Sequence, residues 1–167
     1  MQVFGLAPAT DEPPFDCLNL DFETRSKSRF KSRLMTTGEE VGVLVARGGV
    51  LRGGSLLVDT LGRLVEVVAA DEELLRVEDR AFALMRCAYH LGNRHVRIEI
   101  TEGYLQFRAD PVLAEMLRQL GVHPVTVVSA FEPEWGAYGG GHQHGHEATF
   151  PEDYALAQAV FASRGPG

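Results

Sequence analysis

The hydrophobic pattern of this chain changes period part-way along, and that change restricts the folds it can adopt. Before Ala70, apolar residues alternate or form short runs, and no stretch has helical spacing. After Asp71, strand-like and helix-like stretches follow in the order β-α-β-β-α-β, which is typical of a ferredoxin-like domain. We therefore predict an α+β protein with a small all-β domain at residues 1–70, a ferredoxin-like domain at 71–131 and a histidine-containing tail at 132–167.

The first domain is predicted from short strand signals separated by glycines. Apolar and polar residues alternate from Cys17 to Glu23, as in a half-buried strand. The glycine pairs at 48–49 and 53–54 lack the Gly-Lys-Ser or Gly-Lys-Thr of a phosphate cradle, so we interpret them as turns or bulges. Further strands are expected at residues 40–46, 55–58 and 63–68.

A run of cations follows the first predicted strand. Lysine or arginine occupies every second position from 25 to 33: Arg25, Lys27, Arg29, Lys31 and Arg33. If this run is extended, the cations line one face and form a positive stripe on an otherwise acidic protein. Two interpretations stay open: a solvated strand face, and a docking site for an acidic protein partner.

The second domain is predicted to hold two amphipathic helices. Asp79 is the expected N-cap of the first, which ends at Gly92-Asn93, and Cys87 within it is expected to be a small core residue. Asp110 is the expected cap of the second, with Pro111 at its first position and Gly121 at its end. Strands are expected at residues 73–77, 94–100, 104–108 and 125–130.

The second of these predicted strands, residues 94–100, contains a candidate metal ligand. Val96, Ile98 and Ile100 should face the helices, which places His95 on the uncovered face of the sheet. Two subunits could meet on that face, and a two-fold axis would then pair His95 with its copy. A lone histidine is more often structural than a ligand, so both roles stay open.

The tail contains a second candidate for metal binding. His142, His144 and His146 follow three consecutive glycines, whose backbone freedom would let the imidazoles reach one ion. Neutral imidazole is the commonest protein ligand for borderline divalent metals. We predict metal contact here, against the alternatives of a solvated surface loop or a purification tag. Residues 151–162 are expected to form a short helix, packed on the domain or on a partner.

Composition argues against several classes of function. The net charge of −7 argues against nucleic-acid binding, and no apolar run approaches the ~20 residues that span a bilayer. The N-terminus shows no signal peptide, and the two cysteines match no zinc or redox spacing. No nucleophile–base constellation appears, and His146-Glu147 lacks the second histidine of a His-Glu-x-x-His site. We expect a cytoplasmic, non-enzymatic protein that binds neither membrane nor nucleic acid.

Four stretches of the chain carry distinctive motifs. The most specific runs from Tyr89 to Val96, reading Tyr-His-Leu-Gly-Asn-Arg-His-Val. The others are residues 24–29, residues 38–45 and the stretch from Phe131-Glu132-Pro133-Glu134 to His142. Together these stretches resemble the UreE family of urease accessory proteins. The resemblance extends from about Phe15 to His146 and so covers both predicted domains and much of the tail.

This resemblance implies a nickel metallochaperone that delivers Ni(II) to apo-urease. It implies a homodimer in which His95 of each subunit binds one nickel and tail histidines complete or feed the site. The N-terminal domain would engage protein partners, which include the urease accessory GTPase and the complex of urease apoprotein with its accessory proteins. His90, in the same motif, would have a structural role.

The chain also departs from the family pattern. Residues 108–111 lack the histidines that some members carry before the second helix, so we expect no auxiliary metal site there. With only three histidines, the tail is not expected to store much nickel. Zinc and copper compete for such ligands, so a general divalent-metal binding or storage protein is an alternative, as is, less favourably, an RNA-binding ferredoxin-like module.

Overall fold

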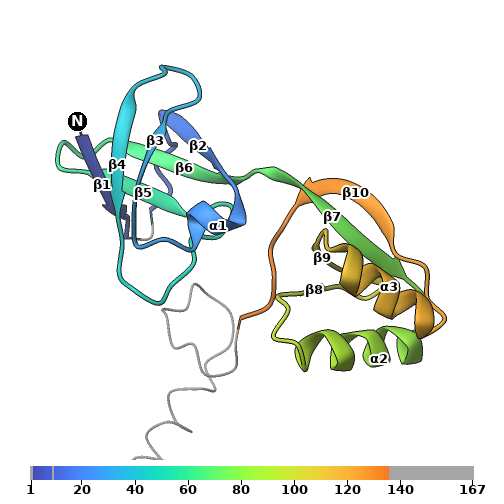
Figure 1. Ribbon diagram of the computed structural model, residues 1–167. Helices are drawn as coiled ribbons and strands as arrows, with labels where there is room; N and C mark the ends of the chain where they lie inside the picture. Colours follow the sequence, from blue (N-terminus) through green and yellow to red (C-terminus); the bar gives the residue numbers. More distant parts are fainter. Residues whose placement is uncertain (1, 9, 136–167) are drawn as a thin grey trace, which may run out of the picture.

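The computed structural model describes residues 2–8 and 10–135, which form two β-sheets and three helices (Figure 1). The first sheet has six strands in the order β2-β6-β5-β1-β4-β3. β1 pairs parallel with β4 and β2 pairs parallel with β6, and the other neighbours are antiparallel. Its strands are β1 (Gln2–Leu6), β2 (Asp16–Leu20), β3 (Arg29–Arg33), β4 (Glu40–Leu44), β5 (Leu56–Asp59) and β6 (Leu64–Ala69).

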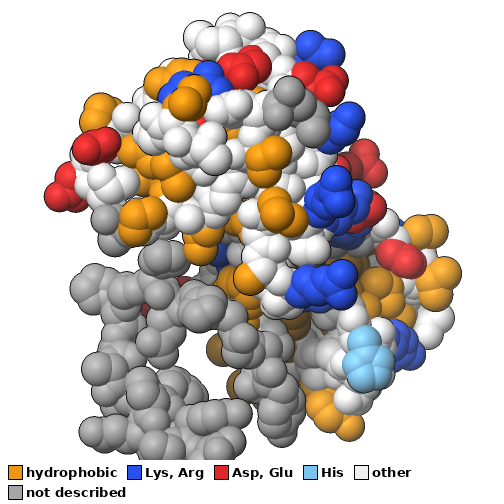
Figure 2. All heavy atoms as spheres, turned by 90° about the vertical axis from the view of Figure 1, so that its left-hand side faces the viewer, with side chains coloured by type: hydrophobic (Ala, Val, Ile, Leu, Met, Phe, Trp, Pro, Cys, Tyr) orange, Lys and Arg blue, Asp and Glu red, His pale blue; other side chains and the backbone are white. Residues whose placement is uncertain are grey.

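This sheet has its own hydrophobic core. Alternate residues of the strands point inward, and Phe4, Leu18, Val41, Leu57 and Val65 are among those fully buried. Figure 2 shows hydrophobic side chains that reach the surface between charged ones on the part of the molecule formed by this sheet. The strands predicted for the first half of the chain agree with the observed ones to within a few residues, and β1 is a further strand that was not predicted.

The expectation that the first half contains no helix is wrong at one point. The strand signal from Cys17 ends at Leu20, and Asp21 caps a single helical turn, α1 (Phe22–Arg25). The Asp21 carboxylate accepts a hydrogen bond from the backbone N–H of Thr24 at 2.7 Å, which satisfies one of the free donors at the start of the helix. This turn moves Arg25 off the strand face on which the alternating pattern placed it.

The second sheet follows directly, because only Ala70 separates the end of β6 from the start of β7 (Asp71–Glu78). Its strands lie in the order β10-β7-β9-β8, and all neighbours are antiparallel. β9 (Tyr104–Arg108) and β10 (Val125–Ala130) have the predicted bounds, whereas β8 consists of Glu99–Ile100 alone. The helices α2 (Ala81–Gly92) and α3 (Pro111–Gln119) both lie on one face of this sheet (Figure 1).

The helices and the sheet enclose a second core. Leu75, Val77, Leu105 and Phe107 of the sheet pack against Cys87, Leu91, Ala114 and Leu117 of the helices. Cys87 is buried as predicted, and burial raises the pKa of its thiol. No helix in the described ranges is both long enough and apolar enough to cross a membrane.

The ends of these helices test the predicted caps. Asp110 caps α3 as predicted, with its carboxylate accepting hydrogen bonds from the N–H groups of Val112 and Leu113, and Gly121 follows with a positive φ of 87°. The predicted cap of α2 is wrong. Arg80 holds the N-cap position without a side-chain bond, and Asp79 accepts a bond from the N–H of Arg80 instead.

A third hydrophobic cluster joins the two sheets. Phe22 of α1 meets Phe131 edge-on, with ring centroids 5.3 Å apart, and Leu74 of β7 is buried beside them. Leu74 lies on the face of the second sheet that the helices leave free. That face is therefore partly covered by the first half of the chain, rather than open as the sequence analysis expected.

Candidate metal site

His95 lies in the turn that ends α2, not in a strand. The N–H of Val96 donates to the carbonyl oxygen of Leu91 at 3.1 Å, and the N–H of His95 donates to that of Gly92 at 2.9 Å. These two bonds form a Schellman motif, in which one residue adopts the left-handed conformation. His95 is that residue, with φ of 56°, and its side chain is exposed.

The predicted strand at residues 94–100 is thus wrong over most of its length. Val96 and Ile98 do pack against the core between helices and sheet, as predicted, but they form no ladder with β9. The carbonyl oxygen of Ile98 instead accepts a hydrogen bond from the N–H of Glu134 at 2.8 Å. His95 therefore stands at the end of a helix, and the prediction that it lies on the uncovered sheet face is corrected.

The left-handed backbone at His95 is unusual for a residue with a β-carbon. Glycine is the usual residue at this position, because a side chain there costs about 1–2 kcal/mol. Non-glycine residues in this conformation occur more often at functional sites than elsewhere. Among the described residues His95 is the only non-glycine residue with positive φ, so the turn displays an imidazole where glycine would be more stable.

The described part of the chain does not contain a complete metal site. Within residues 2–8 and 10–135, no group of three or more histidine, cysteine, aspartate or glutamate side chains is placed to hold an ion. The predicted ligands His142, His144 and His146, like the predicted helix at 151–162, lie outside the described residues. His90, in the last turn of α2, packs edge-on against Tyr89, with ring centroids 5.2 Å apart.

The segment that leads to the tail is held by two arginines. The side chain of Arg25 is fully buried and donates to Glu132 Oε1 at 2.8 Å, and also to the carbonyl oxygens of Leu20, Leu51 and Phe131. Arg52 donates to Glu132 Oε2 at 2.8 Å and to the carbonyl oxygen of Pro133 at 2.7 Å. Burial lowers the pKa of the Arg25 guanidinium, and the Glu132 carboxylate acts in the opposite direction.

Two further contacts complete this anchor. The Arg52 guanidinium lies 4.5 Å from the centroid of the Trp135 ring, within the range of a cation–π interaction. The N–H of Gly53 donates to Glu132 Oε1 at 2.8 Å, and a β-carbon at position 53 would lie only 3.3 Å from that oxygen. Gly53 therefore permits a close approach of residues 132–135. This role was not predicted, since the sequence indicated only a turn or bulge at this glycine.

Sequence reasoning missed these anchoring residues. Arg25 was assigned to a surface stripe, and that assignment is wrong. The cations that are exposed on β3 are Arg29, Lys31 and Arg33, and the last two lie 3.8 Å from Glu40. The signal that was available is the Phe131-Glu132-Pro133-Glu134 stretch, whose buried phenylalanine and acidic neighbour require partners elsewhere.

α2 carries an exposed apolar strip on the side away from the sheet. Phe82, Met85 and Tyr89 lie on one side of the helix and are 70%, 61% and 66% exposed. Large apolar side chains grouped in this way on a surface mark an interaction site more often than isolated ones do. The strip runs toward the end of the helix where His95 lies.

Comparison with known proteins finds two matching family models. The family model for the N-terminal domain of the UreE urease accessory protein matches residues 4–70, and that for the C-terminal domain matches residues 65–155. The chain belongs to the UreE family. Over 145 residues, 86% of this chain, it is 56% identical to the urease accessory protein UreE of Burkholderia lata and 57% identical to that of Burkholderia vietnamiensis.

Other relatives give the same result. The urease accessory proteins UreE of Ralstonia nicotianae and Cupriavidus necator are each 56% identical to the chain over 145 residues. The matched region covers 70% of the Burkholderia lata protein, 72% of the Burkholderia vietnamiensis protein, 68% of the Ralstonia protein and 75% of the Cupriavidus protein. The resemblance inferred from the Tyr89–Val96 motif is confirmed.

Proposed function

We propose that this protein is a nickel metallochaperone that binds Ni(II) and delivers it to apo-urease. Membership of a family of urease accessory proteins implies a role in urease maturation. The observation that carries the finer proposal is the exposed imidazole of His95, held in a left-handed turn where glycine would be more stable. Ni(II) accepts imidazole nitrogen, with carboxylate or water in the remaining positions.

The metal site would be shared between two copies of the chain. A single exposed histidine cannot hold an ion tightly, and within the described ranges no group of three or more candidate ligand side chains is placed to hold an ion. A homodimer whose two-fold axis passes near Tyr89, at the His95 end of the strip formed by Phe82, Met85 and Tyr89, would bring the ends of the two α2 helices together, and with them two copies of His95. The tail histidines His142, His144 and His146 would supply or feed the remaining positions.

A site built in this way suits an ion that must be released. Ligands from two subunits and from a tail can be exchanged one at a time, whereas a closed four-ligand site resists release. Binding needs neutral imidazole, so affinity should weaken as pH falls through about 6–7. Copper and zinc accept the same ligands and would bind in vitro.

We further propose a division of labour between the two sheets. Residues 1–70 form one domain, and residues 71–131 form a ferredoxin-like domain, an assignment supported by the strand order β10-β7-β9-β8 with both helices on one face. The first domain would contact the urease accessory GTPase and the complex of urease apoprotein with its accessory proteins. Arg29, Lys31 and Arg33 on β3 offer an acidic partner an exposed cationic edge. The protein would act in the cytoplasm.

Urease activation in cells tests this proposal. Cells that lack this chain would be complemented with the wild-type protein, with His95→Ala, or with His123→Ala as a matched control that removes an exposed histidine elsewhere. We expect urease activity under limiting nickel to be restored by the wild type and by His123→Ala but not by His95→Ala. Full activation by His95→Ala at equal protein level would contradict the role of His95 in delivery.

A further inference from the structure

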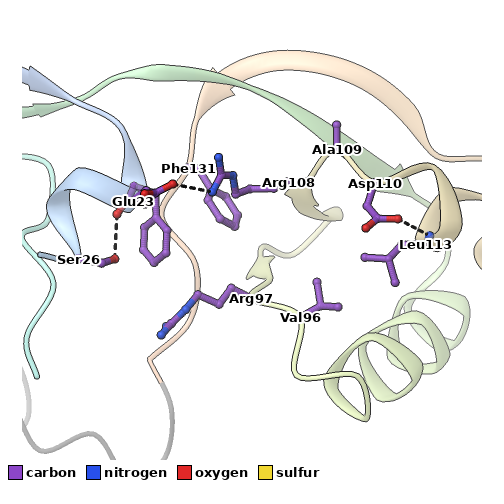
Figure 3. A pocket seen from close by; sticks show the side chains of 10 residues that line it. Glu23, Ser26, Val96, Arg97, Arg108, Ala109, Asp110, Leu113 and Phe131 are labelled. Carbon is purple, nitrogen blue, oxygen red and sulfur yellow. Dashed lines mark hydrogen bonds and ion pairs between the residues drawn. The ribbon is translucent and has the colours of Figure 1, made fainter.

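A groove runs between α1 and the second half of the molecule (Figure 3). Its volume is about 560 Å³, within the range of small-ligand sites. Its accessible apolar wall is formed by the half-buried Val96 and Leu113, since the rings of Phe22 and Phe131 are only 6% and 0% exposed. Arg97 and Arg108 supply two cations from different segments. Neither the proposed metal site nor the Arg25–Glu132 anchor uses this groove.

The charges in the groove favour an anionic occupant. Arg97 forms no ion pair with any described residue, and its guanidinium lies 5.5 Å from the centroid of the Phe22 ring. Arg108 is 56% exposed at its side chain and lies 3.6 Å from Glu72 and 3.8 Å from Glu23, too far for strong ion pairs.

The two acidic residues in the groove already have partners. Asp110 is engaged in capping α3, and Glu23 lies 3.3 Å from Lys27. The groove therefore offers an apolar wall with two incompletely paired guanidinium groups. A segment that combines carboxylates with an aromatic ring would complement both features.

We propose that residues 147–154 of this same chain bind in the groove. Their sequence, Glu-Ala-Thr-Phe-Pro-Glu-Asp-Tyr, contains three carboxylates, two aromatic rings and no lysine or arginine. Phe150 or Tyr154 would contact the wall formed by Val96 and Leu113, and Glu152 and Asp153 would pair with Arg97 and Arg108. We name residues 147–154 the acidic–aromatic segment.

The length of the chain permits this binding. The described residues end at Trp135, whose ring contacts the Arg52 guanidinium. The backbone N–H of Glu134 donates a hydrogen bond to the carbonyl oxygen of Ile98, which follows the groove residue Arg97 in the sequence. The 15 residues from Trp135 to Phe150 can span at most roughly 50 Å, so the acidic–aromatic segment can return to the same region.

The histidine tract would then be held on both sides, by the contact of Trp135 with Arg52 before it and by the docked acidic–aromatic segment after it. This would keep the tract close to the turn that carries His95. Val96 lines the groove directly after His95, and Phe150 is four residues from His146, a reach of at most roughly 14 Å. The segment would thus raise the effective concentration of the tail imidazoles at His95. This consequence for metal binding rests on the proposed function, whereas the docking itself does not.

Disulfide trapping tests the docking without metal. In the full chain with Cys17→Ser, Ser26→Cys places a thiol in the groove and Ala155→Cys places one beside the acidic–aromatic segment without removing its charges or rings. The matched control combines Ala155→Cys with Thr60→Cys, an exposed position in the turn between β5 and β6. Oxidation is followed by mass spectrometry in the presence of a chelator.

We expect the groove pair to form an intramolecular disulfide about tenfold faster than the control pair, because docking raises the local thiol concentration. Adding Arg97→Glu to the groove pair should reduce its rate to that of the control. Equal rates for the two pairs, a rate unaffected by Arg97→Glu, or a disulfide formed only between two chains would overturn the proposal. Since the assay excludes metal, a failure here would leave the nickel-binding role of His95 to be judged separately.

Discussion

The fully buried guanidinium of Arg25 donates a hydrogen bond to the carboxylate of Glu132 at 2.8 Å and joins the two halves of the molecule. The two residues are 107 positions apart in the sequence. The pair holds the first residues of the tail against the N-terminal sheet. The arginine bonds to three backbone carbonyl oxygens in addition, so its charge is well compensated despite its burial.

Arg25→Gln should destabilise the protein by about 3 kcal/mol, because removing one partner of a buried ion pair leaves the other groups without donors. The matched control is Arg29→Gln on the exposed strand β3, which should change the free energy of unfolding by no more than about 0.5 kcal/mol. Urea unfolding of both variants measures the difference. Similar small effects for the two variants would contradict the assignment of Arg25 as an anchor.

Arg52→Gln should loosen the root of the tail without unfolding the domain. The variant loses the cation–π contact with Trp135 and the bond to Pro133. Trp135 is the single tryptophan of the chain, so its fluorescence reports on this contact alone. We expect greater quenching by acrylamide, with a loss of stability of about 1 kcal/mol. Unchanged quenching would show that Arg52 does not hold this ring.

Asp16→Asn should destabilise the protein by about 2–3 kcal/mol at neutral pH. Burial alone would raise the pKa of Asp16, but hydrogen bonds from the N–H groups of Thr36, Thr37 and Cys17 outweigh it and hold the pKa far below its usual range. The ionised form therefore stabilises the fold fully above about pH 4, and this contribution is lost as pH falls further.

The pH dependence distinguishes this charge effect from a simple packing defect. The stability gap between wild type and Asp16→Asn should be constant from about pH 5 to 8 and should narrow steadily below about pH 4. Thermal unfolding across this pH range measures the gap. A gap that stays the same down to pH 2 would contradict the role assigned to the ionised carboxylate.

Met85→Lys should weaken the proposed dimer. A charge in the middle of the exposed strip on α2 would have to be desolvated in the interface, at a cost of several kcal/mol. Val112→Lys is the control, since Val112 is an apolar residue of α3 that is 75% exposed, compared with 61% for Met85. Sedimentation should show monomers for Met85→Lys and dimers for the wild type and the control. Intact dimers of Met85→Lys would place the interface elsewhere.

Local sequence signals predicted much of the fold. Tyr104 to Arg108 alternates between apolar and polar residues, Val125 to Ala130 is rich in valine, and both strands have the predicted bounds. Asp110 with Pro111 predicted the start of α3 because both residues act through the adjacent backbone. These features depend on neighbours in the sequence, so the sequence alone reveals them.

The errors occur where distant residues decide the structure. The alternation correctly predicted that Val96 and Ile98 pack against the core, but it was wrong for Ile100, which is 48% exposed. It also could not show that the carbonyl oxygen of Ile98 accepts a hydrogen bond from Glu134 instead of pairing with β9. Alternating cations suggested a strand face at Arg25, yet a helical turn and the partner Glu132, far away in the sequence, bury that residue. His95 was identified as a candidate ligand, but the alternating pattern placed it on a strand, whereas the structure places it in the turn that ends α2.

Nickel titration of His95→Gly tests the central claim most directly. Glycine relieves the left-handed turn, so the variant should be about 1 kcal/mol more stable than His95→Ala and at least as stable as the wild type. We expect the wild type to bind one tightly held Ni(II) per two chains. His95→Gly should lose this site by more than about 100-fold in affinity, since even mutations of residues that only support metal ligands cost 10–100-fold. Tight binding with unchanged affinity and stoichiometry in this well-folded variant would contradict the claim that His95 holds the metal.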